Sequence, residues 1–561
     1  MHPCFLEDPP LRRHFGYGLA ALVLLSTAVA VAAERDPLPP TQLQKALDTL
    51  AAGARHAIAD DQTPGIAIAV VHGDEVIFAE GFGTRDVTTG EPVDPDTVFQ
   101  LASLSKPIGS TLISGLIGDG KLTWDERLSD LTPGFALQEP WVTNQVTIRD
   151  LYSHRSGLPD HAGDLLEDYG YDREEVLHRL RFLPPQTSFR SGYAYTNFGI
   201  TAAAVAAAST TGMDWETLSE ERLYKPLGMT STSSRYADFM AETNRAVGHV
   251  RVDGKWAFVE QRQPDPQSPA GGVTSSVNDL TKWVRLLVNE GKFEGEQVIA
   301  TEPLDAAHLP MMITGYAPNG TPSFYGLGWN VGYAGDARHS ISHSGAFAMG
   351  AGTTVNISLD DKLGVIVLTN GAPVGVSESL ANEFMDNAVI GAPRYPWHEV
   401  FTGIFAQMAE EGITHNFDTP PVDAGPAAAD AAYLGSYVND FYGPIEVVTG
   451  ANGLNLLIGP NRRPFELGHF DRDTFTFQTI GENASGITGV TFALDGEGKA
   501  RSVWIEAFDH SGLGTFARAH ILPQSIPGLW SGRPVVPPEN QTSPFEPRRQ
   551  QCHAGDVTLP E

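Results

Sequence analysis

Apolar and polar positions alternate in blocks along the first 400 residues, and the blocks predict strands at both ends with helices between them. Residues 66–71 and 76–79 are short runs rich in Val, Ile and Ala, and the polar stretch between them predicts a hairpin. Residues 353–355 and 363–368 are β-rich runs much later in the chain. Since the middle has helical patterning, the economical architecture is one antiparallel sheet in which the two ends meet, covered by helices. We therefore predict an α+β domain over residues 34–400.

A second pattern begins after residue 400. Residues 401–432 are predicted to be a linker, because their last part, from 419 onward, is rich in Pro, Ala, Gly and Asp. Short β-rich runs then recur between Gly and Asn turn signals through residues 433–520, which predicts a small all-β barrel or sandwich. These runs are 445–448, 454–458, 474–477, 490–494 and 502–505. Residues 521–561 are Pro-rich and are predicted to be an irregular tail.

The N-terminal residues 1–33 have the pattern of an export signal. Arg12 and Arg13 precede a nearly uninterrupted apolar run over 15–30, and small residues suited to cleavage follow it. The run also approaches the ~18 residues that span a bilayer, so an uncleaved membrane anchor is the alternative. We predict a periplasmic or secreted bacterial protein, exported by the general or the twin-arginine route, that contacts a membrane only if the signal is uncleaved.

Charge and cysteine content exclude several classes of protein. The chain has 68 acidic and 37 basic residues, a formal net charge of −31, and no basic patch of the kind that nucleic-acid binding requires. Its two cysteines, Cys4 and Cys552, lie near opposite ends, so neither a disulfide framework nor a thiolate metal site is available. Neither a metal-ligand pattern around His154 and His161 nor a phosphate-binding loop is recognisable. We predict no metal, no cofactor and no nucleic-acid partner.

The candidate chemistry begins with Ser103 and Lys106, at a predicted strand-to-helix junction. The chain has no other lysine with a serine three residues before it. Residues three apart on a helix share a face, so a lysine amine there can take the proton that makes a serine hydroxyl nucleophilic. The alternative for the pair alone is a helix start with Ser103 as N-cap and a solvated Lys106.

Tyr195 and Asn197 form the second candidate pair, in a Gly-flanked loop before an apolar helix. In an extended segment, side chains two residues apart point the same way, so a phenol and an amide can face one site. Nearby cations would lower the Tyr195 pKa below ~10, which suits a general base. A packing Tyr with a turn-forming Asn is the alternative.

The third candidate segment opens a predicted strand and contains His343, Gly345 and Ala346. Gly345 lets a backbone approach closely, and the N–H of Ala346 can donate to an oxyanion. His343 is predicted to supply a cation near Tyr195 or to hydrogen-bond it. A structural histidine is the alternative.

These three segments, in this order and at wide spacing, resemble the penicillin-recognising serine hydrolases, with the closer likeness to class C β-lactamases, serine D-peptidases and related esterases. Residues 99–107 resemble that family's nucleophile segment, and 151–159 resemble its Leu-x-x-His-x-Ser-Gly-Leu-Pro stretch. Residues 269–276 resemble its Gly-Gly-x-x-Ser-Thr segment, with Ser as the last residue. The likeness covers about residues 45–390. The block 433–518 resembles the lipocalin-like β domain often fused behind such hydrolases.

The resemblance implies a β-lactamase/transpeptidase-like fold and acyl-enzyme chemistry. It implies that Ser103 attacks an amide or ester carbonyl, that Lys106 activates Ser103, and that Tyr195 is the general base and later the acid to the leaving group. Asn197 would orient the substrate amide, and His343 would tune Tyr195. The backbone N–H groups of Ser103 and Ala346 would hold the oxyanion.

One departure from the family bears on the substrate. Penicillin-binding proteins and most β-lactamases carry Lys-Thr-Gly in the third motif, where this chain has His-Ser-Gly at residues 343–345. A histidine is neutral much of the time near pH 7 and binds a β-lactam carboxylate less well than lysine. We therefore predict a small-molecule or peptide substrate, first peptides with D or non-standard residues, then esters, then β-lactams. A penicillin-binding sensor that acylates and stalls is the alternative of another class.

Overall fold

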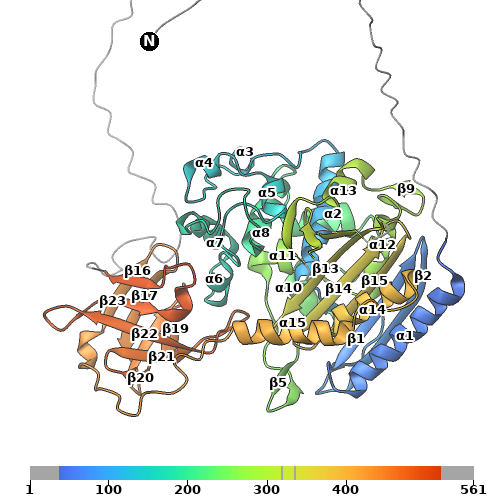
Figure 1. The fold of residues 1–561 in the computed structure, drawn as a ribbon. Helices are drawn as coiled ribbons and strands as arrows, with labels where there is room; N and C mark the ends of the chain where they lie inside the picture. Colours follow the sequence, from blue (N-terminus) through green and yellow to red (C-terminus); the bar gives the residue numbers. More distant parts are fainter. Residues whose placement is uncertain (1–36, 317–319, 334–336, 520–561) are drawn as a thin grey trace, which may run out of the picture. The chain divides into compact units, whose positions relative to one another are not determined.

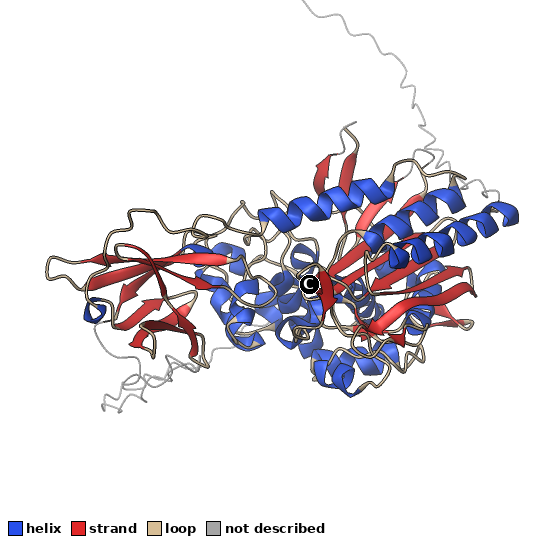
Figure 2. Ribbon diagram, turned by 90° about the horizontal axis from the view of Figure 1, so that it is seen from below, coloured by secondary structure: helices blue, strands red, loops and turns tan. Residues whose placement is uncertain are grey.

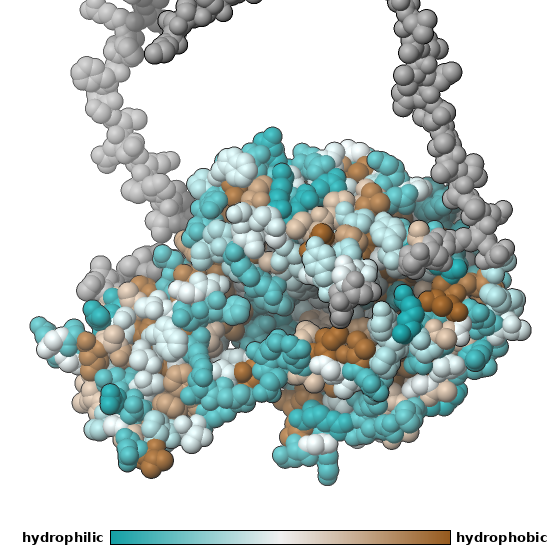
Figure 3. Space-filling model, in the orientation of Figure 1, coloured by the Kyte–Doolittle hydropathy of each residue, from teal (hydrophilic) through white to brown (hydrophobic). Residues whose placement is uncertain are grey.

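The computed structural model describes residues 37–316, 320–333 and 337–519 (Figure 1). The predicted export signal, the whole predicted Pro-rich tail and both cysteines lie outside these residues. Within the described part of the chain, no helix is long and apolar enough to cross a membrane. The face shown in Figure 3 is mostly hydrophilic with scattered hydrophobic patches, as the acid-rich composition leads one to expect.

The first sheet is antiparallel and joins early and late segments of the first 400 residues. β1 pairs with the neighbouring β2 on one side and with the distant β15 on the other. This confirms the predicted hairpin and the predicted meeting of early and late strands. In spatial order the nine strands are β10 (Met312–Tyr316), β11 (Pro322–Tyr325), β12 (Asn330–Tyr333), β13 (His339–Phe347), β14 (Ala351–Ser358), β15 (Leu363–Thr369), β1 (Gly65–His72), β2 (Glu75–Asp86) and β3 (Glu91–Pro92).

Helices cover both faces of this sheet (Figures 1 and 2). Alternate residues of β1 belong to two different cores: Ile66, Ile68 and Val70 pack with α1 (Pro40–Ala59) and α14 (Val376–Val389). Ala67, Ala69 and Val71 belong to the larger core on the opposite face. Because side chains alternate along a strand, a run that is apolar throughout indicates burial on both faces.

The larger core contains the helices that carry the candidate chemistry. After one 3₁₀ turn, η1 (Ala102–Leu104), the helix predicted after Ser103 runs as α2 (Ser105–Gly118). The predicted apolar helix near residue 200 is α8 (Asn197–Ser209), and α12 (Val277–Val288) packs against β1 and β15.

Shorter elements complete this region. Strand β4 (Phe99–Gln100) pairs with β7 (Thr274–Ser275), β5 (Val250–Val252) with β6 (Lys255–Ala257), and β8 (Lys292–Phe293) with β9 (Glu296–Gln297). The short helices are α3 (Leu128–Leu131), α4 (Pro140–Thr143), α5 (Ile148–Tyr152), α6 (Asp164–Asp168), α7 (Arg173–Arg179), α9 (Trp215–Ser219), α10 (Tyr236–Ala241), α11 (Ser268–Gly271) and α13 (Thr301–Ala307).

The predicted linker from residue 401 begins inside a helix, α15, which follows α14 in the chain. Helix α15 (Trp397–Glu411) has no buried residue, and it ends before the Pro- and Ala-rich stretch. The composition typical of a linker is confined to that later stretch. Composition therefore did not reveal that the residues before it form a helix.

The second sheet also has nine antiparallel strands and forms a nearly closed barrel, with its edge strand β19 contacting β21. All five predicted β-rich runs are strands. In spatial order the strands are β19 (Arg463–Glu466), β18 (Leu454–Ile458), β17 (Gly443–Thr449), β16 (Gly435–Asn439), β24 (Thr515–Arg518), β23 (Ala500–Ile505), β22 (Ile487–Leu494), β21 (Thr474–Gln478) and β20 (Gly468–Asp471).

Candidate active site

Ser103 lies at a sharp junction between β4 and α2. The preceding residue, Ala102, has φ +48°, a left-handed conformation that is uncommon for a residue with a side chain. The backbone here is held on both sides, because Leu101 N–H donates to Val273 O and Leu101 O accepts from Thr353 Oγ1. This junction leaves Ser103 partly exposed while its neighbours are buried. Such strain is typical of functional sites.

Lys106 is fully buried one turn after Ser103. Its Nζ lies 2.9 Å from Ser103 Oγ, 2.7 Å from Asn197 Oδ1 and 3.0 Å from Ala270 O. Burial lowers the pKa of Lys106 to about 7, against the nearby charge of Asp164, which raises it. A substantial fraction of the amine is therefore neutral near pH 7, and the alternative of a solvated lysine at a helix start is wrong.

Tyr195 reaches the same serine from the opposite side. Its hydroxyl donates to Ser103 Oγ at 2.7 Å, and Lys106 Nζ lies 4.5 Å from the centre of its ring. Burial holds the pKa of Tyr195 well above its usual value, and the hydrogen bond to Ser103 opposes this only in part. The predicted lowering of this pKa is wrong because loss of hydration outweighs the nearby cation. In the resting site Tyr195 is a proton donor.

When Lys106 is neutral, each hydrogen bond around Ser103 has one donor and one acceptor. Two amine hydrogens of Lys106 are directed to Asn197 and Ala270, which leaves the lone pair for the hydroxyl of Ser103. Ser103 Oγ in turn accepts the hydrogen of Tyr195. The arrangement can remove the serine proton to Lys106 while Tyr195 stabilises the oxygen left behind.

Asn197 joins Lys106 to a buried carboxylate. Its amide nitrogen donates to Asp164 Oδ2 at 2.7 Å, and His161 Nδ1 lies 2.9 Å from the same oxygen. That hydrogen bond raises the pKa of His161, although burial opposes the change. Asp164 was not predicted from the sequence, and His161 was weighed there only as a metal ligand. No motif marks either residue, because only the fold brings α6 beside α8.

His154 supports the backbone that presents Tyr195. Its Nδ1 accepts the N–H of Thr196 at 3.1 Å, and its ring lies 4.6 Å from the ring of Tyr195. Burial lowers the pKa of His154 well below its usual value, so the ring is neutral. These contacts agree with a structural hydrogen-bonding role.

His343 is buried and neutral, which contradicts the prediction of a cation. Its Nδ1 donates to Ser344 O at 2.6 Å, so its Nε2 accepts the hydroxyl of Tyr325 at 2.9 Å. Burial, with a smaller contribution from the charge of Lys106, lowers the pKa of His343 to about 3. Its polar partners are Tyr325 and Ser344 rather than Tyr195, so the predicted direct hydrogen bond to Tyr195 is also absent from the described contacts.

Gly345 lets β13 run directly beside the nucleophile. A Cβ at this position would collide with Leu101 O and Thr353 Oγ1, and would lie 2.8 Å from the backbone nitrogen of Ser103. The predicted close approach is therefore an approach of two backbones. Ala346, the next residue, is exposed.

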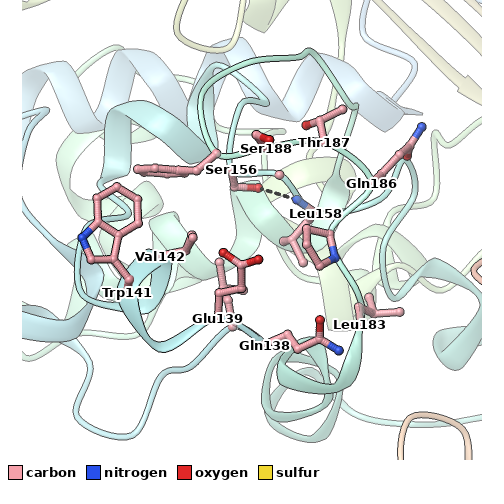
Figure 4. A pocket seen from close by; sticks show the side chains of 14 residues that line it. Gln138, Glu139, Trp141, Val142, Ser156, Leu158, Leu183, Gln186, Thr187 and Ser188 are labelled. Carbon is pink, nitrogen blue, oxygen red and sulfur yellow. Dashed lines mark hydrogen bonds between the residues drawn. The ribbon is translucent and has the colours of Figure 1, made fainter.

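Two hollows lie outside this cluster. The first, of about 510 Å³, is bordered by the side chains of Trp141, Glu139 and Leu158, and Figure 4 shows them turned toward a common space. The second, of about 890 Å³, is lined by residues that include Ser342 and Ser344, which alternate with His343 along β13. The second hollow therefore belongs to the opposite face of the sheet, and Ser103 lines neither of them.

Comparisons with protein-family models divide the chain into two matched parts. A model described as Beta-lactamase matches residues 47–390. A model described as a domain of unknown function, DUF3471, matches residues 419–514.

Two named relatives align with most or half of the chain. The unguisins hydrolase ungD of Aspergillus violaceofuscus (strain CBS 115571) is 28% identical over 490 residues, which cover 80% of this chain and 86% of that protein. Penicillin-binding protein 4 of Amycolatopsis lactamdurans is 30% identical over 302 residues, which cover 51% of this chain and 76% of that protein.

Two solved structures share the fold. An octameric penicillin-binding protein homologue from Pyrococcus abyssi has a TM-score of 0.54 at 18% identity and covers 82% of this chain and 98% of its own. EstCE1, described as a hydrolase with promiscuous acyltransferase activity, also has a TM-score of 0.54 at 18% identity, and covers 62% of this chain and 99% of its own.

Proposed function

Since the chain belongs to the beta-lactamase family and is a serine hydrolase, we propose that it cleaves peptides or amides with D or non-standard residues through an acyl-enzyme on Ser103. The observation that carries the proposal is the buried Lys106 amine, 2.9 Å from Ser103 Oγ, with a pKa of about 7. A base with a pKa near the working pH combines availability with proton affinity.

In the acylation step, Ser103 Oγ bonds to the carbonyl carbon and its proton passes to Lys106 Nζ. The backbone N–H groups of Ser103 and Ala346 hold the carbonyl oxygen as it becomes negative. The bond to the leaving amine then breaks, the amine takes the phenolic proton of Tyr195, and Tyr195 recovers a proton from Lys106. The serine proton thus ends on the leaving group, and both side chains return to their starting states.

In the deacylation step, water attacks the ester carbonyl and transfers a proton to the Lys106–Tyr195 pair. The bond from Ser103 Oγ to carbon breaks, and that proton returns to the serine oxygen. The division of labour differs from the expectation for Tyr195 as first base, because its raised pKa favours the proton-donating role. The orienting role of Asn197 also changes, since its amide is occupied by Lys106 and Asp164 and holds the base in place.

The state of His343 supports a substrate without a carboxylate at this position. A ring with a pKa of about 3 provides no cation there at neutral pH. This argues against efficient recognition of β-lactams and leaves amides without a carboxylate at this position as candidates. The same observation favours a second candidate, a carboxylesterase, because short acyl esters carry no carboxylate.

The test is a panel of D-aminoacyl amides, short acyl esters and a chromogenic cephalosporin, with Ser103→Ala as the blank. We expect sustained turnover of the amides or esters above that of the cephalosporin. A single burst of one equivalent with no further turnover would instead identify a stalled penicillin-binding sensor. Export to the periplasm or medium is a separate proposal, tested by N-terminal sequencing of the mature protein from cell fractions.

A further inference from the structure

The turn between β21 and β22 of the second sheet contacts the segment that follows β13. Glu482 accepts the backbone N–H of Ala348 through Oε1 at 2.6 Å and that of Met349 through Oε2 at 3.3 Å. Both residues follow β13 directly, two and three positions after Ala346. One carboxylate from the barrel therefore caps the end of the strand that carries His343 and Gly345.

The same turn also contacts α6, the helix whose Asp164 is linked to Lys106 through Asn197. Asp168, at the end of α6, accepts the N–H of Glu482 at 3.0 Å, the N–H of Asn483 at 2.9 Å and the amide Nδ2 of Asn483 at 2.8 Å. Asn483 Nδ2 also lies 3.3 Å from the backbone oxygen of Asp164, the residue that bonds Asn197. Gly481 has φ +84°, and a Cβ there would collide with Asp168. Glycine thus permits the close approach of the turn.

A buried cation joins the two contacts. Arg262 pairs with Glu167 of α6 at 3.0 Å, and its guanidinium lies 5.5 Å from the ring centre of Phe347, the last residue of β13. Arg262 and Glu167 are both more than nine-tenths buried. A buried pair of this kind keeps its geometry only while both partners are held. The barrel turn, α6 and the end of β13 therefore form one connected network.

We propose that the 480–483 turn of the barrel is part of the catalytic apparatus, with Glu482 a positioning residue for the oxyanion end of β13 and Asn483, through Asp168, a positioning residue for α6. The inference rests on the proposed function, because it assigns the turn to the site that acylates Ser103. It gives the second domain a role that its family description, a domain of unknown function, does not state.

Loss of Glu482 removes the shared acceptor of two backbone N–H groups. Backbone donors left without a partner are costly, and a displacement of about 1 Å at a catalytic group can cost about 10²-fold in rate. In Glu482→Ala we expect kcat on the best panel substrate to fall roughly 10- to 100-fold with KM changed less than threefold. Glu482→Asp, which keeps the carboxylate, should recover part of the loss, and Gly481→Ala should reproduce it.

Hydrogen exchange gives a readout that needs no substrate. In Glu482→Ala we expect the amides of the peptide covering residues 343–349 to exchange at least about tenfold faster than in the wild type, because two backbone donors lose their shared acceptor. The matched control is Glu497→Ala, an exposed glutamate on a different turn of the same barrel, which should leave both exchange and kcat unchanged.

The outcomes separate this inference from the proposed function. If wild-type Ser103 is not labelled by a fluorophosphonate probe, the proposed function fails, while the exchange data still decide whether Glu482 holds the turn. If Ser103 is labelled and Glu482→Ala matches Glu497→Ala in kcat or in exchange, the positioning role is refuted. Loss of kcat together with faster exchange at 343–349, in a variant with a wild-type melting temperature, supports it.

Discussion

The two nine-stranded sheets differ in where they place charge. In the described part of the chain, every buried Asp, Glu, Lys and Arg lies before residue 390, in the region of the first sheet. The barrel core is mainly aromatic and aliphatic, with Tyr433, Phe475 and Phe492 packed ring against ring. Buried charges are costly and are kept where they are paired or functional. The comparison places the buried charges, and with them the candidate chemistry, in the region of the first sheet and leaves the barrel core without them.

The assignment of the chemistry to the region of the first sheet depends most on Ser103 being the nucleophile. Ser103→Ala should reduce turnover by at least about 10³-fold, because the attacking oxygen is lost, and should leave the melting temperature nearly unchanged. Ser114→Ala is the matched control, since Ser114 is a buried serine near the other end of α2 and its hydroxyl donates to Pro303 O. Retention of more than a tenth of the activity by Ser103→Ala would disprove the assignment.

Tyr195→Phe should have the next largest effect. It removes the hydrogen that bonds Ser103 Oγ and the proton for the leaving group, while the ring stays in place beside Lys106. General acid–base contributions are about 10² to 10⁴ in rate, so kcat should fall by that order with KM little changed. Tyr193→Phe, on the same segment, is the control. A near-normal kcat for amide substrates would show that Lys106 alone transfers the protons.

Much of this arrangement was predictable from the sequence, because the strongest patterns are local. The apolar run of β1 predicted a strand of a sheet in which early and late segments meet, and the spacing of Ser103 and Lys106 predicted a shared helical face. The raised pKa of Tyr195 and the hydrogen-bond partners of His343 were not predictable, since they depend on packing against segments far away in the sequence. Asp164 was missed for the same reason: it becomes a partner of Asn197 only after α6 and α8 meet.

The barrel shows where strand patterns fail. Four of its nine strands were not predicted: β16 and β24 lie inside the sheet, and β19 (Arg463–Glu466) and β20 (Gly468–Asp471) are its edge strands. The two edge strands are short and contain charged residues or glycine, and selection for a buried face is weakest at an edge. Whether an edge segment forms a strand depends on pairing with a neighbouring strand rather than on the β-propensity of its own residues.

A charge change next to the site should alter its pH dependence more than its maximal rate. Lys106 acts when neutral, so kcat/KM should rise as the pH increases through its pKa of about 7. The negative charge of Asp164 raises that pKa, so Asp164→Asn should move the rising limb to lower pH. Asp130→Asn, an exposed carboxylate on α3, should not move it. A shift of the limb to higher pH, or a profile flat from pH 5 to 9, would exclude Lys106 as the base.

A substitution in the barrel core should have the smallest effect on catalysis. It distinguishes the stability of the barrel from the contribution of its turns to the site. Leu456 on β18 is fully buried, and Leu456→Ala should lower the free energy of unfolding by about 2–5 kcal/mol through lost burial and the cavity left behind. Val422→Ala, at a fully exposed aliphatic position, should change it by less than about 0.5 kcal/mol. Denaturant unfolding followed by tryptophan fluorescence measures both. While the Leu456→Ala protein remains folded, its kcat should stay within about threefold of wild type, because no contact of Glu482 or Asn483 is removed. A much larger loss of kcat in the folded variant would mean that the whole barrel, and not only its 480–483 turn, sets the geometry around Ser103.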